Sequence, residues 1–238
     1  MYKIRHKDER GKSESDWLDS SHTFSFADYY DPRHMGFSDL RVINDDYITP
    51  GAGFGTHPHK DMEIISVVLE GALQHRDSMG NGTIIKPGEI QKMSAGTGIL
   101  HSEFNPSGNE ITHFLQIWIY PATKDLEPSY QQKAFDTDEL LNRFRLVAAP
   151  DGRDNAITIS QDVELYETKL ESGETITFQL PQNRKIWIHA ATGKFEVHGE
   201  IMEAGDGMAI TDENGPLEFK GMAAISTILL FNLQNQLS

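Results

Sequence analysis

Two short histidine motifs hold the residues best suited to chemistry. His57-Pro-His59 places two imidazoles two residues apart, and His101-Ser-Glu103 places an imidazole and a carboxylate at the same spacing. On a β-strand, side chains two residues apart project from the same face, so each pair can reach one point. Two such strands side by side would surround a cation with three nitrogens and one oxygen, leaving coordination positions open for water, substrate or dioxygen. The chain has no cysteine, so metal ligands must come from His, Asp and Glu.

The residues that flank the motifs follow the spacing of the paired motifs of cupin β-barrels. The first stretch is Gly51-(five residues)-His57-Pro-His59-(three residues)-Glu63, and the second is Ser94-Ala-Gly-Thr-Gly-Ile-Leu-His101-(three residues)-Asn105. Gly96 and Gly98 permit a tight turn that directs His101 inward. The spacing therefore predicts a metal site inside a barrel, with either Glu63 or Glu103 as the carboxylate ligand.

The elements that must position these motifs are mainly strands. The β-branched runs lie at 62–69, 112–120, 186–191 and 223–231. Glycine-rich turns separate them, a pattern that indicates sandwiches or barrels rather than alternating strands and helices. One helix is predicted at 138–144, capped by Asp136 or Thr137, followed by a linker at 148–155. We therefore expect an all-β fold of two jelly-roll barrels with a short helical connection.

The predicted domain boundaries follow from these elements. Residues 1–135 form an N-terminal metal-binding barrel, in which residues 1–40 are an aromatic-rich packing arm. Residues 136–155 form the helix and linker, and residues 156–238 form a degenerate C-terminal barrel. Within the arm, substrate contact by Tyr29 or Tyr30 is the alternative to a packing role.

The C-terminal half has the turns of a second barrel but lacks the histidine set. Aligning the turns of the two halves places Gln179, Pro181 and Glu218 at the positions of the three motif histidines. His189 and His198 remain in this half, but neither has a second histidine two residues away. We therefore expect a metal site in the N-terminal barrel alone.

Other polar and aromatic residues have simpler interpretations. His75 lies beside a predicted hairpin and is interpreted as a solvated edge residue, and His113 opens an alternating strand and is interpreted as structural. Phe114, Gln116 and Trp118 share one face of that strand, as part of the core or as the lining of a pocket for a planar substrate.

The charge of the chain limits its partners. The formal net charge is -15, from 21 basic and 36 acidic residues, and such a surface repels phosphate backbones and anionic lipids. The first residues are charged and lack the apolar stretch of a secretion signal, and no apolar run has the length needed to cross a bilayer. We expect a cytoplasmic protein without direct nucleic-acid or membrane contact.

The motifs resemble those of the pirin family of bicupins. The matching segments are His22-Thr-Phe-Ser-Phe26, residues 53–63, Leu69-Glu-Gly71 and residues 94–106. The resemblance covers most of residues 1–125 and is weaker from about residue 150 onward. It implies that Glu103, rather than Glu63, is the fourth ligand beside His57, His59 and His101.

The resemblance also implies a function, because bacterial members of the family include quercetin dioxygenases. One divalent metal ion per chain is then expected, iron first, with manganese, cobalt, nickel, copper or zinc also compatible. Glu103 would accept the proton of a flavonol hydroxyl, and dioxygen would then open the ring with release of carbon monoxide. The alternatives are a metal-binding regulator that acts through protein partners, and an isomerase or decarboxylase that uses the metal as a Lewis acid.

Overall fold

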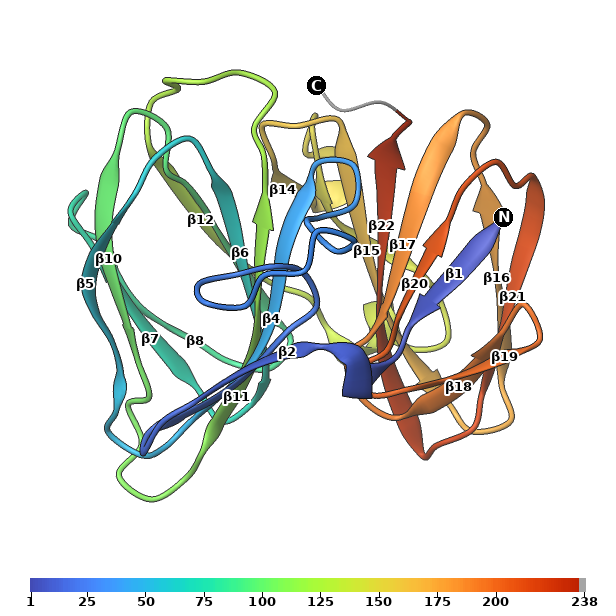
Figure 1. Cartoon of the computed structure of the whole chain (residues 1–238), viewed down its shortest axis with the longest axis horizontal. Helices are drawn as coiled ribbons and strands as arrows, with labels where there is room; N and C mark the ends of the chain where they lie inside the picture. The colour runs from blue at the N-terminus through green and yellow to red at the C-terminus, as the bar shows by residue number, and fades with distance from the viewer. Residues whose placement is uncertain (236–238) are drawn as a thin grey trace. The chain divides into compact units, whose positions relative to one another are not determined.

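The computed structural model describes residues 1–235, and its regular elements are almost all β-strands, which confirms the predicted all-β class. The chain divides into two compact units (Figure 1). The N-terminal unit comprises Gly11–Ala134 and Ile157–Gln161, and the C-terminal unit comprises Met1–Arg10, Phe135–Ala156 and the chain from Asp162 onward.

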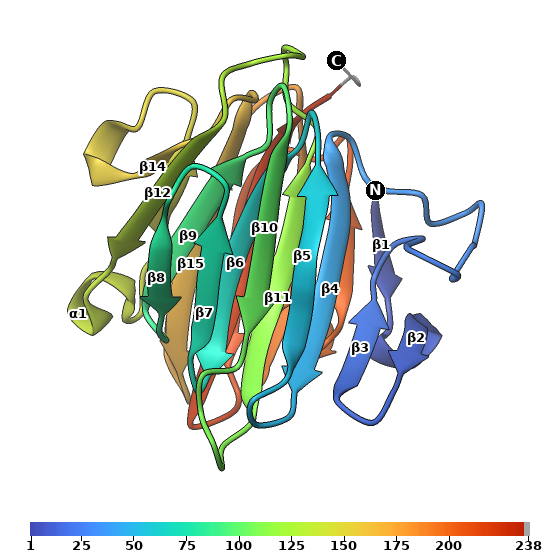
Figure 2. The same cartoon turned by 90° about the vertical axis from the view of Figure 1, so that its left-hand side faces the viewer.

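Two antiparallel sheets form the N-terminal unit. The larger has the order β12-β9-β6-β11-β4-β3-β2 and the smaller has the order β5-β10-β7-β8; Figure 2 views the unit from the side of the smaller sheet. The strands of these sheets are β2 (Gly11–Glu14), β3 (Leu18–His22), β4 (Leu40–Ile48), β5 (Gly53–His59), β6 (Glu63–Glu70), β7 (Leu73–Asp77), β8 (Gly82–Ile85), β9 (Glu89–Ser94), β10 (Ile99–Phe104), β11 (Thr112–Ile119) and β12 (Ser129–Ala134). The two-residue strand β14 (Ile157–Thr158) also belongs to this unit.

The β-branched runs at 62–69 and 112–120 form β6 and β11, as predicted, and these strands pair in the middle of the larger sheet. Apolar side chains pack in clusters inside the unit. One cluster contains Ile48, Val68, Leu73, Ile85 and Phe114. Another contains Ile64, Met93, Ala95 and Ile99. Polar side chains of the same strands, such as Ser66 and Gln116, are also buried.

The C-terminal unit has the same arrangement of a larger and a smaller sheet. The orders are β1-β20-β17-β22-β15-β13 and β16-β21-β18-β19. Its elements are β1 (Tyr2–Arg5), η1 (Lys7–Glu9), α1 (Thr137–Leu140), β13 (Arg145–Ala149), η2 (Arg153–Asn155), β15 (Val163–Glu171), β16 (Thr175–Leu180), β17 (Arg184–Ala190), β18 (Lys194–Val197), β19 (Glu200–Glu203), β20 (Gly207–Ile210), β21 (Gly215–Gly221) and β22 (Ile225–Gln234).

The first forty residues differ from the predicted packing arm, because they contribute strands to both units. β1 pairs with β20 in the C-terminal unit, and β2 and β3 extend the larger sheet of the N-terminal unit. β1 and β3 pair with strands more than twenty residues away, and β2 pairs with the neighbouring β3. The local sequence of a short strand does not predict which distant strand it will pair with.

The predicted helix at 138–144 is shorter in the structure, and the predicted linker contains a strand. Helix α1 ends at Leu140; Asn142 has a positive φ of 51°, and its backbone N–H donates to the Lys169 carbonyl of β15. Arg145–Ala149 then forms β13. Pairing with β15 therefore overrides the local helical propensity. No helix in the described part of the chain has the length and apolar character of a membrane span.

Candidate metal centre

Strands β5 and β10 bring the three motif histidines together. The strands pair antiparallel with His101 opposite His57, and His59 follows two residues later on β5. The ring centroids of His57 and His101 are 4.4 Å apart, and each lies 4.8 Å from that of His59. One nitrogen of each ring lies within 4.8 Å of the corresponding nitrogens of the other two. The three imidazoles form a group that could hold one metal ion.

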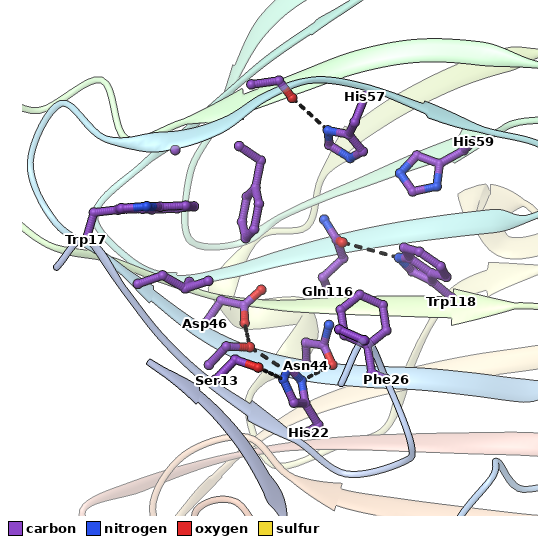
Figure 3. Close-up of a pocket in the computed structure, with 16 residues that line it drawn as sticks. Ser13, Trp17, His22, Phe26, Asn44, Asp46, His57, His59, Gln116 and Trp118 are labelled. Atoms are coloured by element: carbon purple, nitrogen blue, oxygen red, sulfur yellow. Dashed lines mark hydrogen bonds between the residues drawn. The ribbon is translucent and has the colours of Figure 1, made fainter. Parts of the chain in front are cut away.

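The hydrogen bonding and protonation of these rings suit a metal. His57 Nδ1 donates to the Gly55 carbonyl oxygen at 2.8 Å (Figure 3), which leaves Nε2 as the acceptor. His59 Nε2 and both nitrogens of His101 are buried without a hydrogen-bond partner among the described residues. Burial, followed by the nearby His57, lowers the pKa of His59 to about 4, and burial also lowers the pKa of His101. Neutral imidazole is the form that binds metals, so the donor set fits a cation.

Glu103 lies beside the three histidines in an adjoining group. A register shift separates it from His101 along β10, because His101 faces His57 while Glu103 faces Phe54. The extra residue of this bulge lies on β5, whereas β10 pairs regularly with β7 and places Glu103 opposite His75. A Glu103 oxygen lies within 4.8 Å of nitrogens of His101 and His75. His101 thus belongs to both groups.

Two neighbours hold the Glu103 carboxylate inside the unit. Ser66 Oγ donates to one oxygen at 3.2 Å, and Gln116 Nε2 donates to the other at 2.5 Å. Burial raises the pKa of Glu103 to about 7, although these hydrogen bonds oppose the shift. Gln116 in turn accepts a hydrogen bond from Trp118 Nε1 at 3.2 Å. The carboxyl group is therefore fixed in direction and can exchange a proton near neutral pH.

Glu63, the other carboxylate that the sequence left open, lies on the opposite face of β6 from Ser66, because the two residues are three positions apart. It accepts hydrogen bonds from Ser94 Oγ at 3.0 Å and from the Ser160 backbone at 3.1 Å, and Lys92 Nζ lies 3.8 Å away. These contacts hold the Glu63 carboxylate away from both histidine groups.

The prediction that His75 is a solvated edge residue is wrong. Its side chain is fully buried, its Nε2 lies 3.0 Å from Asp77 Oδ2, and its ring centroid is 5.4 Å from that of His101. The signal was present in the alternation of β7: Leu73, His75 and Asp77 share one face, and the apolar Leu73 identifies that face as the interior. His113 has the structural role predicted for it, because its Nε2 lies 2.7 Å from Asp45 Oδ1.

A cavity of about 460 Å³ opens beside His57 and His59. Aromatic side chains form much of its wall. Sixteen residues line it: Ser13, Trp17, Leu18, Ser20, His22, Phe26, Ala27, Asn44, Asp46, Gly53, Phe54, Gly55, His57, His59, Gln116 and Trp118 (Figure 3). The rings of Trp17 and Phe54 meet edge to face at 5.1 Å, and those of Phe26 and Trp118 at 5.3 Å. Flat apolar walls next to a histidine cluster fit a planar aromatic ligand.

The cavity settles two alternatives that the sequence left open. Gln116 and Trp118 line the cavity, whereas Phe114 belongs to the apolar core. In the aromatic N-terminal segment, Phe26 reaches the cavity instead of Tyr29 or Tyr30. The polar lining residues of β2, β3 and β4 were not identified from the sequence, because only the pairing of distant strands assembles them.

The C-terminal unit has apolar side chains at the places that correspond to the histidines. β16 and β21 occupy the positions of β5 and β10 in the matching sheet order. Gln179 and Glu218, which the turn alignment placed there, are exposed, whereas the adjacent Phe178, Leu217 and Phe219 point inward. The alignment was therefore one residue out of phase, which on a strand reverses the face. Within residues 1–235, both metal-compatible groups lie in the N-terminal unit.

Comparison with known proteins agrees with this architecture. Residues 3–119 match the family model described as Pirin, and residues 146–233 match the model described as Quercetinase C-terminal cupin domain. The quercetin 2,3-dioxygenase of Escherichia coli (strain K12) is 50% identical over 213 residues, which cover 90% of this chain and 91% of that protein. A putative quercetin 2,3-dioxygenase of Pasteurella multocida (strain Pm70) is 44% identical over 218 residues, covering 90% of this chain and 92% of that protein.

A solved structure shows the same similarity in three dimensions. The bacterial pirin YhhW from Escherichia coli, crystallised in complex with nickel(II), superimposes with a TM-score of 0.92 at 47% identity, covering 98% of this chain and 99% of that one. Both halves match, in order, so the bicupin prediction is confirmed. Residues 3–119 match the Pirin model, and half of the aligned residues, over nine tenths of the chain, are identical to those of the Escherichia coli quercetin 2,3-dioxygenase. The chain therefore belongs to the pirin family.

Proposed function

We propose that the chain is a metal-dependent dioxygenase that cleaves the flavonol ring of quercetin-like substrates with dioxygen and releases carbon monoxide. The observation that supports this proposal most strongly is the histidine group at the wall of an aromatic cavity of about 460 Å³. The relatives named as quercetin 2,3-dioxygenases favour the same activity.

The proposed ligands of one divalent metal ion are His57, His59, His101 and Glu103. The buried, unpaired ring nitrogens suit the ion, and each Glu103 oxygen retains a lone pair beyond the hydrogen bond it accepts. Iron is the proposed native metal, and manganese, cobalt, nickel, copper and zinc fit the same donors. When bound, the metal supplies Lewis acidity and redox chemistry.

The protein's own contribution to the reaction is orientation and proton transfer. The aromatic walls hold a flat substrate with its 3-hydroxyl toward the histidines. Glu103 accepts the hydroxyl proton as general base, and its pKa, raised to about 7, suits a proton acceptor at neutral pH. Gln116 and Ser66 keep the carboxylate in place while the charge changes. The ring then loses one carbon as carbon monoxide when dioxygen adds.

The test is metal analysis of the purified protein, coupled to quercetin turnover with and without dioxygen and with detection of carbon monoxide. We expect one metal ion per chain and carbon monoxide release only in the presence of dioxygen. One metal per chain without carbon monoxide, across several reconstituted metals, would favour the regulator that acts through protein partners. Turnover without dioxygen on a redox-inert metal would favour an isomerase or decarboxylase.

For the setting of this activity we propose the cytoplasm, with a flavonol-like small molecule and dioxygen as partners. The net charge of -15 supports the expectation that the protein does not contact nucleic acid directly.

A further inference from the structure

A cluster of hydrogen-bonding side chains lies across the cavity from the histidines and is not used by the proposed chemistry. Figure 3 shows His57 and His59 on one side of the cavity and the polar cluster on the other. Its members come from β2, β3 and β4, and they are Ser13, Ser20, His22, Asn44 and Asp46.

The histidine of this cluster is held by its neighbours. His22 Nδ1 lies 2.8 Å from Asn44 Oδ1, and His22 Nε2 lies 2.8 Å from Ser13 Oγ. Because an amide oxygen only accepts, Nδ1 is the donor, and Nε2 accepts from the Ser13 hydroxyl. This places the Asn44 oxygen against His22, so the Asn44 amide NH₂ is directed elsewhere.

Two polar groups of β4 are left to face the cavity. Asn44 and Asp46 lie two residues apart on one strand face and are only 3% and 1% exposed. One Asp46 oxygen accepts a hydrogen bond from Ser20 Oγ. The other oxygen and the Asn44 amide nitrogen have no hydrogen-bond partner among residues 1–235, and the Asp46 carboxyl group points into the cavity (Figure 3). Buried polar groups without partners are costly, so this pair is suited to a ligand.

The chemistry of the pair identifies the ligand group. Asn44 offers a donor, and the Asp46 carboxyl oxygen accepts a hydrogen bond. Burial, with smaller contributions from the nearby carboxylates of Asp45 and Glu103, raises the pKa of Asp46 to about 8, so the neutral acid can also donate. A phenolic hydroxyl both donates and accepts, and the aromatic walls between the two ends of the cavity fit the flat ring that would bear it.

We infer that Asn44 and Asp46 form a second recognition point, which binds a phenolic hydroxyl at the end of the substrate remote from the histidines. The site then selects flavonols with hydroxyl groups beyond the one at position 3. This inference rests on the proposed function for the orientation of the substrate, but it concerns affinity rather than turnover.

The experiment measures binding without turnover. Calorimetric titrations of the metal-loaded protein, kept free of dioxygen, would compare 3-hydroxyflavone, galangin, which adds two hydroxyls on the fused ring, and quercetin, which adds two more on the pendant ring. We expect galangin or quercetin to bind at least about tenfold more tightly than 3-hydroxyflavone, the value of one or two good hydrogen bonds. Which of the two shows the gain identifies the ring that reaches Asp46.

Variants test whether Asn44 and Asp46 cause the tighter binding of the more hydroxylated flavonols. Asp46→Leu should remove most of the tenfold ratio between ligands, whereas Asp46→Asn, which keeps an accepting oxygen, should retain most of it. Asp45→Asn is the matched control, because Asp45 faces away from the cavity and contacts His113. Its ratio should equal that of the wild type.

A wild-type ratio near one would overturn the inference, as would an unchanged ratio in Asp46→Leu. Should Asp46→Leu fail to give a folded protein, Asn44→Ala replaces it, again with the ratio expected to fall. Failure of the proposed function looks different: no carbon monoxide would be released from any flavonol, while the ratio of binding constants would still decide the inference.

Discussion

The two units of the chain share one arrangement of a larger and a smaller sheet but differ in the side chains at matching interior positions. In the C-terminal unit, a large apolar cluster includes Phe178, Leu217 and Phe219, on the strands that match those of the histidines. In the N-terminal unit, polar side chains such as Glu103 and His75 are buried in the interior together with smaller apolar clusters. Because apolar side chains occupy the matching positions of the C-terminal unit, the fold itself does not require the buried polar side chains beside the histidines. Each of these buried groups needs a hydrogen-bond partner or a ligand.

The largest expected effect is loss of the metal from the N-terminal unit. His101 belongs to both metal-compatible groups, so His101→Ala should reduce the metal content from one per chain to nearly none and abolish flavonol cleavage. Elemental analysis of the purified variant checks this. His198→Ala, an exposed histidine of the C-terminal unit, is the control and should retain the metal. Full metal content in His101→Ala would refute the site.

Glu103→Gln separates metal binding from proton transfer. The amide keeps an oxygen toward the ion but cannot act as a base, so most of the metal should remain while kcat falls by about 100-fold or more. Steady-state kinetics with metal analysis on the same sample measure both. Glu63→Gln, on the opposite face of β6, should keep the specific activity of the folded protein. Turnover of quercetin by Glu103→Gln at the wild-type rate would show that the base is another group.

Phe219→Ala tests the apolar interior of the C-terminal unit. Removing a fully buried ring should lower the free energy of unfolding by about 3–5 kcal/mol, measured by urea denaturation, without lowering the metal content of the folded protein. The exposed neighbour in Glu218→Ala should change stability by less than about 0.5 kcal/mol. Loss of metal in folded Phe219→Ala would show that the units are not functionally distinct.

A buried carboxyl group of the C-terminal unit gives a smaller, pH-dependent effect. Burial raises the pKa of Glu167 to about 7, with Lys169 opposing the shift. The folded-state pKa lies above the unfolded value, so the contribution of Glu167 to stability is greatest below about pH 4.5 and falls as the pH rises toward 7. Glu167→Gln should match the wild type at pH 4 and exceed it by about 3 kcal/mol at pH 8. A stability difference between Glu167→Gln and the wild type that is the same at pH 4 and at pH 8 would contradict this.

Sequence reasoning succeeded where local spacing determines geometry. The i, i+2 pairs at His57 and at His101 required only a strand to share a face, and the β-branched runs supplied the strands. The sequence also predicted that the second half lacks a set of histidines. Even so, the turn alignment there failed by one residue, because turn lengths differ between the halves and the strand period is two.

What could not be predicted depends on pairing between distant segments. Asn44 and Asp46 reach the cavity because β4 pairs with β11, and Ser20 reaches Asp46 because β3 pairs with β4. The hydrogen bond from Gln116 of β11 to Glu103 of β10 joins the two sheets, and it too depends on how distant segments come together. His75 is the exception, since the alternation of β7 indicates its burial without knowledge of its partners.

The central claim, one metal held by the N-terminal unit, is tested most directly by anomalous diffraction at the absorption edge of the metal in crystals of the loaded protein. We expect one peak per chain, about 2.0–2.2 Å from nitrogens of His57, His59 and His101 and from an oxygen of Glu103. A peak among the apolar side chains of the C-terminal unit, or one bound by His75 without His57 and His59, would contradict it.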